Sequence, residues 1–303
     1  MKKKLLKLVW LFAAVSFNAN AADDAGFKSI FNGKNLAGWD GESKLWSVQD
    51  GAITGVTTDE EPLAYNKFII WRGGVVKNFE LRAQFRLFGK SNSGIQYRSK
   101  EAPDRGDYVV VGYQADIHPS PANNVMLYDE QGRGILANHG QKMFIGAKGE
   151  KMLAGSTGPV QKADMEDWNE LTIIARGNHI IHKLNGKTTI DLIDHHKEER
   201  ELEGILAFQV HRGPAMKIQF KNIRLKTLPD GGVLSLAQAP IPADAKNVSK
   251  PKRAPSSSWT APPHRFGPGP TSWRTVNINN SYGRVLIRAV STSCIPIPMS
   301  RPA

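Results

Sequence analysis

The chain is poor in cysteine and has no long apolar run. Its 303 residues contain one cysteine, Cys294, so the protein cannot close an internal disulfide and must rely on packing. The longest apolar stretch, from Leu5 to Phe17, is shorter than the roughly 20 residues that a membrane-spanning helix needs. These two absences exclude a disulfide scaffold and predict no membrane span.

Acidic residues are outnumbered, but the excess of positive charge lies at the two ends. Residues 1–21 hold four Lys and no acidic residue, and residues 229–303 hold nine Lys or Arg against two acidic residues. Residues 22–228 therefore carry only +1 of the formal net charge of +12. Because this central part is electrically balanced, the basic sequence pI does not predict binding to nucleic acid.

The first 21 residues have the pattern of a secretory signal peptide. Four lysines precede the apolar stretch, and residues 19–21 (ANA) form an A-x-A cleavage signal. We expect cleavage after Ala21 and a periplasmic or secreted protein.

Residues 229–303 differ in composition from the rest of the chain. They contain 12 of the 18 prolines, with Ser and Arg and little periodicity. Such a segment buries too little apolar surface to offset the entropy of ordering. We predict a folded domain over residues 22–228, followed by a disordered tail over residues 229–303.

The central residues have the pattern of an all-β domain. Apolar and polar residues alternate from Phe79 to Leu87 with a period of two. The pairs Asp50-Gly51 and Asn185-Gly186 suit tight hairpin turns. No amphipathic helix of four turns is evident. Many strands at short spacing predict a β-sandwich or jelly roll.

Three predicted strands, residues 92–98, 112–118 and 207–211, place polar side chains where a strand face would normally be dry. Alternation along each strand puts two polar residues on one face. The pairs are Gln96 and Arg98, Gln114 and Asp116, and Gln209 and His211. Such strands side by side form a polar surface that suits a polar ligand such as a sugar. We therefore predict one site on one sheet face that includes Arg98, Gln114, Asp116 and His211.

Eight segments carry a family resemblance through their order and spacing. They are FKSIFNGKNLAGWDG at 27–41, WSVQDG at 46–51, FELR at 79–82, NSGIQYR at 92–98, GYQADI at 112–117, LYDEQGRGIL at 127–136, WNE at 168–170 and HRGPAMKIQFKNIRLK at 211–226. Together they resemble the 3-keto-disaccharide hydrolase family, from about Phe27 to Leu228. The resemblance implies a concanavalin- or laminin-G-like jelly-roll β-sandwich. It also implies action on glycosides oxidised to the ketone at sugar carbon 3, and a functional link to a sugar 3-dehydrogenase.

The chemistry of such a substrate defines what the site needs. A ketone at C3 acidifies the hydrogen on C2, so a base can remove it and the resulting enolate can expel the aglycone from C1. Water then adds back. The site needs a base, a group that stabilises the enolate oxygen, and an acid for the leaving group. The paired carboxylates of ordinary glycosidases are not required, and the chain has no E-x-D-x-x-E motif.

We assign candidate roles on this basis. His211 is the candidate base, since an ordinary histidine pKa near ~6.5 suits proton transfer. Arg98 is the candidate enolate clamp, and Asp116 and Glu130 complete the catalytic set. The candidate substrate-binding residues are Gln96, Gln114, Tyr128, Gln209 and Arg133.

Structural alternatives exist for several of these residues. Arg98 could instead pair with Asp116 or Glu130, Glu130 could pair with Arg133 in a surface loop, and the polar face could be a buried network. His211, Asp116 and Glu130 could together bind a divalent ion, although no local spacing matches a zinc motif. The sequence leaves the cofactor open. It also leaves open a non-catalytic sugar-binding module or a conventional glycosidase.

Overall fold

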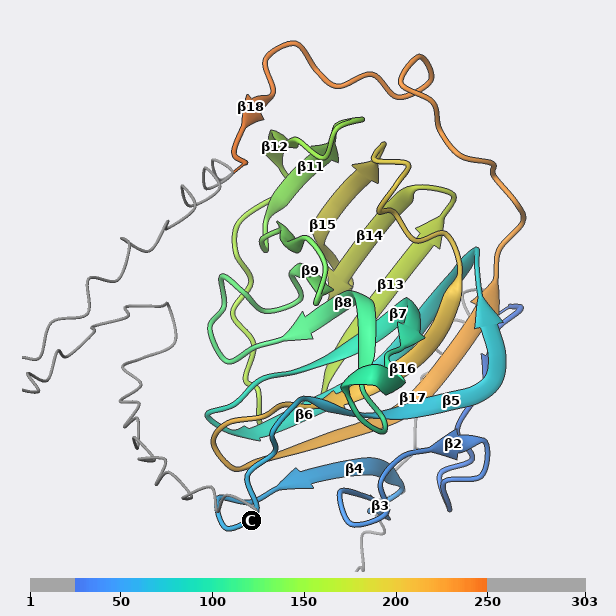
Figure 1. Cartoon of the computed structure of the whole chain (residues 1–303), viewed down its shortest axis with the longest axis vertical. Coiled ribbons are helices and arrows are strands. Elements are labelled where there is room, and N and C mark those ends of the chain that lie inside the picture. Colours follow the sequence, from blue (N-terminus) through green and yellow to red (C-terminus); the bar gives the residue numbers. More distant parts are fainter. Residues whose placement is uncertain (1–24, 250–303) are drawn as a thin grey trace, which may run out of the picture. The chain divides into compact units, whose positions relative to one another are not determined.

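The computed structural model describes residues 25–249, which belong to one compact unit. Among these residues the only helical element is the 3-10 turn η1 (Pro103–Arg105). All other elements are β-strands, and they form two sheets that pack face to face (Figure 1). The predicted all-β sandwich is confirmed.

The larger sheet has eleven strands and is antiparallel except where β11 pairs with β15. In spatial order they are β18 (Lys246–Asn247), β12 (Lys151–Ser156), β11 (Gln141–Ile145), β15 (Lys187–Asp194), β14 (His179–Leu184), β13 (Asn169–Arg176), β6 (Phe79–Gly89), β17 (Met216–Thr227), β4 (Ala52–Thr57) and β3 (Trp46–Gln49), with β1 (Lys28–Ser29) paired to β17.

The smaller sheet has seven strands and carries the polar face predicted from the sequence. In spatial order they are β10 (Gly134–Ala137), β9 (Leu127–Glu130), β8 (Val110–Ile117), β7 (Ser93–Glu101), β16 (Gly204–Val210), β5 (Lys67–Val76) and β2 (Trp39–Asp40). The three polar strands, β7, β8 and β16, are thus direct neighbours at the centre of this sheet.

The main hydrophobic core lies between the two sheets. In β6 the apolar residues from Phe79 to Leu87 are buried, and the polar residues between them are partly exposed. Phe208 of the smaller sheet stacks on Phe220 of the larger sheet, with ring centroids 4.2 Å apart. The period-two pattern in the sequence therefore marks the inward face of the sandwich.

The predicted hairpin turns form as expected. Asn185 and Gly186, between β14 and β15, have φ values of 48° and 79°. Asp50 and Gly51, between β3 and β4, have φ values of 53° and 71°. Two successive positive φ values are what a type I′ turn requires, and they match the twist of the strands that it joins.

A second, smaller hydrophobic cluster covers the outer face of the smaller sheet. Phe68, Ile70, Val110 and Ala207 form it, and Tyr108 packs against it. Tyr108 belongs to the segment that connects β7 to β8, and its carbonyl accepts a hydrogen bond from the Phe68 N–H at 3.0 Å. Gln96, Gln114 and Gln209, on the same face, are also buried, although they lie outside the main core.

Residues 229–249 differ from the disordered tail that we expected to begin at residue 229. The Asn178 side chain exchanges two hydrogen bonds with the backbone of Leu234, at 3.0 and 2.8 Å. Further on, His195 contacts the Ala239 carbonyl at 2.9 Å, and β18 pairs with β12. Backbone hydrogen bonds to buried side chains hold this segment in place without an apolar core of its own.

The predicted signal peptide and the remainder of the predicted tail, residues 250–303, lie outside the described residues. Between residues 25 and 249, no helix is long and apolar enough to cross a membrane.

Candidate functional site

The strand pairing brings the predicted polar residues together on the outer face of the smaller sheet. Residues paired across neighbouring strands share a face. Gln114 pairs with Gln96 on one side and with Tyr128 on the other. Gly94 pairs with Asp116, and Gln96 with Ala207. Because Gly94 has no side chain, the Gln114 side chain can lie across it, where a Cβ atom would come within 2.4 Å of Gln114.

Asp116, the second-last residue of β8, shares this face and is 3% exposed. Its Oδ1 atom contacts Asn92 Nδ2 at 3.2 Å and the Gln114 amide at 2.9 Å. No described residue hydrogen-bonds to Oδ2. Burial raises the pKa of Asp116 to about 7, against the lowering effect of its two hydrogen bonds, and the nearby Glu130 charge raises it further. Asp116 therefore offers an uncommitted carboxyl oxygen that is partly protonated at neutral pH.

Three glutamine side chains continue from Asp116 as a buried chain of amides. The Gln114 amide lies 2.9 Å from that of Gln209 and 3.3 Å from that of Gln96. All three side chains are at most 1% exposed. One amide atom of Gln209 has no partner among the described residues. A buried amide atom without a partner is costly and marks a place where a ligand or water can bind.

Glu130, at the end of β9, joins this region through Asn66. Asn66 Nδ2 donates to Glu130 Oε1 at 3.3 Å, and Asn66 Oδ1 accepts from the Arg212 N–H at 3.0 Å. Burial raises the pKa of Glu130, while hydrogen bonds and the Arg212 charge lower it. Asn66 thus links Glu130 to the residue that follows His211.

His211 lies directly after β16, and its half-buried imidazole has no hydrogen bond to a described side chain. Burial lowers the pKa of His211, and the nearby His118 imidazole acts in the same direction. The Ser91 hydroxyl is also buried and has no partner among the described residues. Ser91 Oγ and His211 Nδ1 lie 4.0 and 3.9 Å from the point where a Cβ atom of Gly213 would stand. This end of the face therefore holds a neutral histidine beside an unused hydroxyl.

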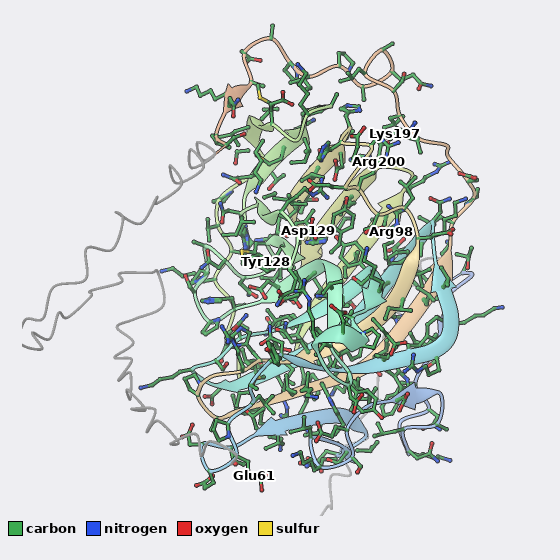
Figure 2. All side chains as sticks on the ribbon, in the orientation of Figure 1. Glu61, Arg98, Tyr128, Asp129, Lys197 and Arg200 are labelled. Atoms are coloured by element: carbon green, nitrogen blue, oxygen red, sulfur yellow. The ribbon has the colours of Figure 1, made fainter. Side chains whose placement is uncertain are left out.

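Arg98 does not belong to the site, contrary to our prediction. It has a φ of 49°, and the β7–β8 register shifts between Gln96 and Lys100. This bulge breaks the alternation, so the two residues do not share a face as counted from the sequence. The Arg98 guanidinium instead donates to the carbonyls of Lys77 and Gly177, at 2.8 and 2.7 Å. It lies apart from Tyr128, which does pair with the polar strands (Figure 2).

Arg133 is also placed differently from our prediction. Its guanidinium contacts Asp129 and Asp194, each at 2.8 Å, and the Tyr113 hydroxyl at 3.0 Å. Tyr113 and Asp129 alternate with the polar-face residues and so point away from that face. Arg133 therefore belongs to a buried ion-pair network. Its carboxylate partner in β9 is Asp129, whereas we had considered a pair with Glu130.

The divalent ion that we considered finds no ready ligand set. Within residues 25–249, no three His, Cys, Asp or Glu side chains are grouped so that they could hold a metal ion. His211, Asp116 and Glu130 share a region without converging on one point.

Several residues of the site were missed in the sequence. Ser91 and Asn92 precede β7, Asn66 precedes β5, and Arg212 follows His211. Ser91, Asn66 and Arg212 lie outside the predicted strands, so counting along a strand could not find them, whereas Asn92 begins the predicted strand 92–98 with the same parity as Gln96 and was overlooked. The family segments contain Asn92 and Arg212, which was the other available signal.

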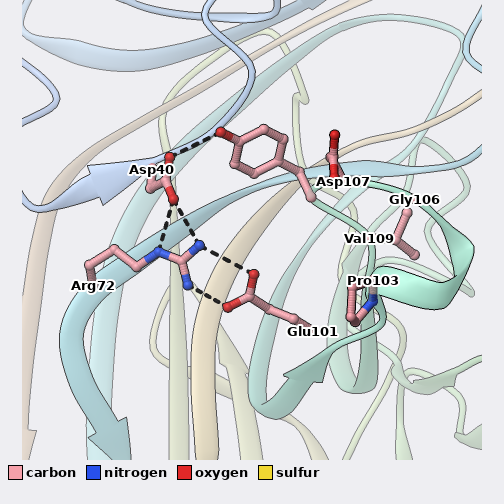
Figure 3. Close-up of a pocket in the computed structure, with 8 residues that line it drawn as sticks. Asp40, Arg72, Glu101, Pro103, Gly106, Asp107 and Val109 are labelled. Atoms are coloured by element: carbon pink, nitrogen blue, oxygen red, sulfur yellow. Dashed lines mark hydrogen bonds and ion pairs between the residues drawn. The ribbon is translucent and has the colours of Figure 1, made fainter.

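A surface cavity of about 250 Å³ lies elsewhere on the smaller sheet. Arg72 there pairs with Asp40 at 2.8 Å and also with Glu101, and Tyr108 donates to Asp40 (Figure 3). None of the predicted site residues lines it. Arg72 is thus engaged by Asp40 and Glu101, two of the three carboxylates that line the cavity; the third is Asp107.

The fold and the polar face define a β-sandwich with a titratable site on one sheet. The sequence pattern of the 3-keto-alpha-glucoside-1,2-lyase-like domain matches residues 26–226. The chain belongs to this family, as the resemblance in the sequence indicated.

Solved structures give more distant likenesses. A candidate glycosyl hydrolase from Parabacteroides distasonis is 20% identical, with a TM-score of 0.46 over 68% of this chain and 96% of that chain. The carbohydrate-binding module CBM66 from Bacillus subtilis is 14% identical, with a TM-score of 0.42 over 63% of this chain and 96% of that chain. These likenesses are too distant to carry an argument about function. No curated protein matches the chain significantly.

Proposed function

We propose that this protein cleaves 3-keto-glycosides by removing the C2 proton and eliminating the aglycone, after which water adds to C1. The family supports the substrate class. One observation carries the mechanism: burial raises the pKa of Asp116 to about 7, and it lowers the pKa of His211, which directly follows the polar strand β16. Two titratable groups whose protonation is set in opposite senses by the same desolvation are suited to act as acid and base.

The proposed roles follow from these protonation states. Neutral His211 accepts the C2 proton, and the electron pair of that C–H bond forms the enolate of the C3 ketone. The enolate collapses to a C1=C2 bond and breaks the bond between C1 and the aglycone oxygen. Protonated Asp116 donates its proton to that oxygen. Water adds at C1 and a proton returns to C2, so the net reaction is hydrolysis.

The cation that we assigned to the enolate needs a new candidate, because Arg98 is engaged elsewhere. Arg212 is adjacent to His211, and its charge is felt at Glu130. We assign Arg212 to the developing oxyanion, with the buried donors of the polar face beside it. Tyr128, Gln96 and Gln114 remain candidate substrate-binding residues.

The function also predicts a supplying reaction and a location. The substrate must first be oxidised at C3, so a sugar 3-dehydrogenase must act before this enzyme. The signal-peptide pattern of residues 1–21 leads us to propose a periplasmic or secreted enzyme.

The deciding experiment uses the full chain with a 3-keto-glucoside in heavy water, with and without a chelator. Released aglycone, together with solvent deuterium at C2 of the 3-keto-sugar, is the expected result. Release with only protium at C2, and equal cleavage of the unoxidised glycoside, indicates a conventional glycosidase. Saturable sugar binding without any release indicates a non-catalytic carbohydrate-binding module.

A further inference from the structure

Three strands of the smaller sheet end beside one another, and each leads into a polar residue. Ser93, the first residue of β7, pairs with Ile117, the last residue of β8, and its hydroxyl donates to the Gln209 carbonyl of β16 at 2.7 Å. The residues that adjoin these strand ends are Asn92, His118 and His211. His118 therefore lies at the same edge of the sheet as the proposed base.

His118 is close to both proposed catalytic groups. The His118 imidazole acts on the pKa of His211. Asp116 precedes His118 by two residues, and Asn92, at the start of the neighbouring strand, donates to Asp116 Oδ1 at 3.2 Å. Neither the base step nor the acid step uses His118, so its own chemistry is open.

The loop after β8 fixes which ring nitrogen of His118 carries the proton. The Ser120 N–H donates to His118 Nδ1 at 2.9 Å, and the His118 N–H donates to the Asn124 side-chain oxygen at 3.3 Å. Because a backbone N–H can only donate, Nδ1 keeps its lone pair, and the proton of the neutral ring is on Nε2. Burial lowers the pKa of His118, so the ring is neutral at pH 7.

His139, which bonds to the same loop, has the opposite tautomer. His139 Nδ1 lies 2.8 Å from the Asn124 carbonyl, and His139 Nε2 accepts from the Gln161 N–H at 3.0 Å. Both of its nitrogens are occupied, and its proton is on Nδ1. For His118, the bond from Ser120 is the only side-chain hydrogen bond within residues 25–249, which leaves an Nε2–H group free to donate to a ligand.

We propose that His118, held as the Nε2–H tautomer by the Ser120 N–H, donates a hydrogen bond to the C3 oxygen of the sugar while the ketone becomes an enolate. The identity of the ligand rests on the proposed function. In this step the C2 proton goes to His211 and the electron pair of the C2–H bond passes to the C3 carbonyl. The Nε2 proton stays on His118.

Two physical arguments favour a neutral histidine in this role. A donor that is fixed before the reaction needs no reorganisation when charge develops on the oxygen, and a neutral imidazole can polarise a carbonyl in this way. A neutral His118 also does not oppose the positive charge that His211 gains with the C2 proton. Arg212 is exposed, so solvent screens its charge, and a directional donor at the C3 oxygen complements it.

The first test measures the tautomer of His118 without any ligand. Full-length protein labelled with 15N-histidine is studied by long-range 1H–15N correlation NMR, in which a protonated ring nitrogen and a bare one have well separated shifts. The His118 signals are assigned by their loss in His118→Asn, and the His139 signals by their loss in His139→Asn. At pH 7 we expect the Nε2–H tautomer for His118 and the Nδ1–H tautomer for His139.

A His118 ring that is protonated at pH 7, carries its proton on Nδ1 or exchanges between the two tautomers would overturn the proposed arrangement. Because no substrate is present, this result is independent of catalysis. An active enzyme with such a ring would leave the proposed function standing and remove this inference.

The second test separates the two ring nitrogens by substitution. In His118→Asn the side-chain oxygen can still accept from the N–H two residues on, as in an Asx-turn, but nothing replaces the Nε2–H donor. The melting temperature should be unchanged, and kcat should fall by about 10²–10³-fold, as when one oxyanion donor is removed. The fall should be equal for a 3-keto-disaccharide and a nitrophenyl 3-keto-glucoside, because both form the same enolate. His118→Gln, whose longer amide carries an N–H toward the Nε2 position, should recover part of the rate.

The matched control is His179→Asn, the same change at a histidine of the larger sheet, which should leave kcat unchanged. Equal kcat values for His118→Asn and His179→Asn would overturn the role of His118 and leave the proposed function standing. A loss confined to the disaccharide would place His118 at the leaving group and would also overturn it. Failure of the wild type to cleave either substrate would remove the proposed function, and the role of His118 with it.

Discussion

Burial acts on the Asp116 and His211 side chains with opposite results. It disfavours the charged form of each group, so His211 loses its proton more readily and Asp116 holds its proton more tightly. A neutral base and a neutral acid are what an elimination needs at neutral pH. The predictions at the residue scale follow from these two protonation states.

The first prediction concerns His211. His211→Ala should lower kcat/KM for 3-keto-glycosides by about 10²–10⁴-fold, the usual loss when a general base is removed. In the wild type the acid limb of the pH profile should lie below the ordinary histidine pKa, because burial lowers the pKa of His211. The variant should lose this limb. Steady-state rates between pH 4 and 9 check both points, and a variant as active as wild type would exclude His211 as the base.

The second prediction concerns Asp116 as the acid. Asp116→Asn keeps the shape and hydrogen bonds of a protonated carboxyl group but has no proton to give. It should slow a 3-keto-disaccharide by about 10²-fold or more. An aryl 3-keto-glucoside with nitrophenol as its leaving group needs little acid assistance and should lose less than tenfold. Equal losses for both substrates would contradict the assignment.

The third prediction is thermodynamic. The pKa of Asp116 is raised to about 7 in the folded protein, against about 3.9 in the unfolded chain, so the folded state binds the proton more tightly. Stability from this group is present below pH ~4 and is lost as the pH rises through about 7, by up to ~4 kcal/mol. The difference in free energy of unfolding between wild type and Asp116→Asn should follow this change. Denaturant titrations from pH 4 to 8 measure it, and a flat difference would refute the raised pKa.

At the scale of elements, the bulge in β7 marks the point beyond which alternation in the sequence no longer predicts the face of a side chain. Strict alternation held for Gln96, Gln114 and Asp116, whose strand segments pair in register. It failed at Arg98, because one residue with a positive φ shifts every later side chain to the opposite face. The pattern of a strand reveals its faces only up to the first bulge, and a bulge at an arginine has no sequence signal of its own.

The fourth prediction belongs to that bulge. Arg98→Met leaves the carbonyls of Lys77 and Gly177 without their buried donor, and should destabilise the fold by about 2–4 kcal/mol. The activity of the folded fraction should be retained. Lys100→Met, two residues further along β7 and exposed, should change stability by less than about 0.5 kcal/mol. A stable Arg98→Met variant without catalytic activity would show that Arg98 does belong to the site.

At the scale of the whole molecule, composition predicted the sandwich but placed its end too early. The proline-rich stretch after Leu228 has no periodicity, and sequence patterns detect segments by the apolar surface that they bury. Residues 229–249 instead attach through backbone groups. The Leu234 backbone bonds to the buried Asn178 side chain, and the Ala239 carbonyl contacts His195. These contacts depend on where Asn178 and His195 lie in the fold. The sequence of residues 229–249 does not contain that information.

The last prediction tests where the folded unit ends. A chain that stops after residue 249 should melt with the full-length protein, whereas a chain that stops after Leu228 should melt earlier. The shorter chain leaves the Asn178 amide, which is 1% exposed, without its two partners on Leu234, at a cost of roughly 2 kcal/mol. For a domain of this size, that corresponds to about 4–8 °C in Tm. Both chains should keep the same kcat, because the Asp116 and Gln209 hydrogen bonds involve no residue beyond 228. Equal melting of the two truncated chains would place the boundary at Leu228 after all, and early melting of both would mean that residues 250–303 contribute to the fold.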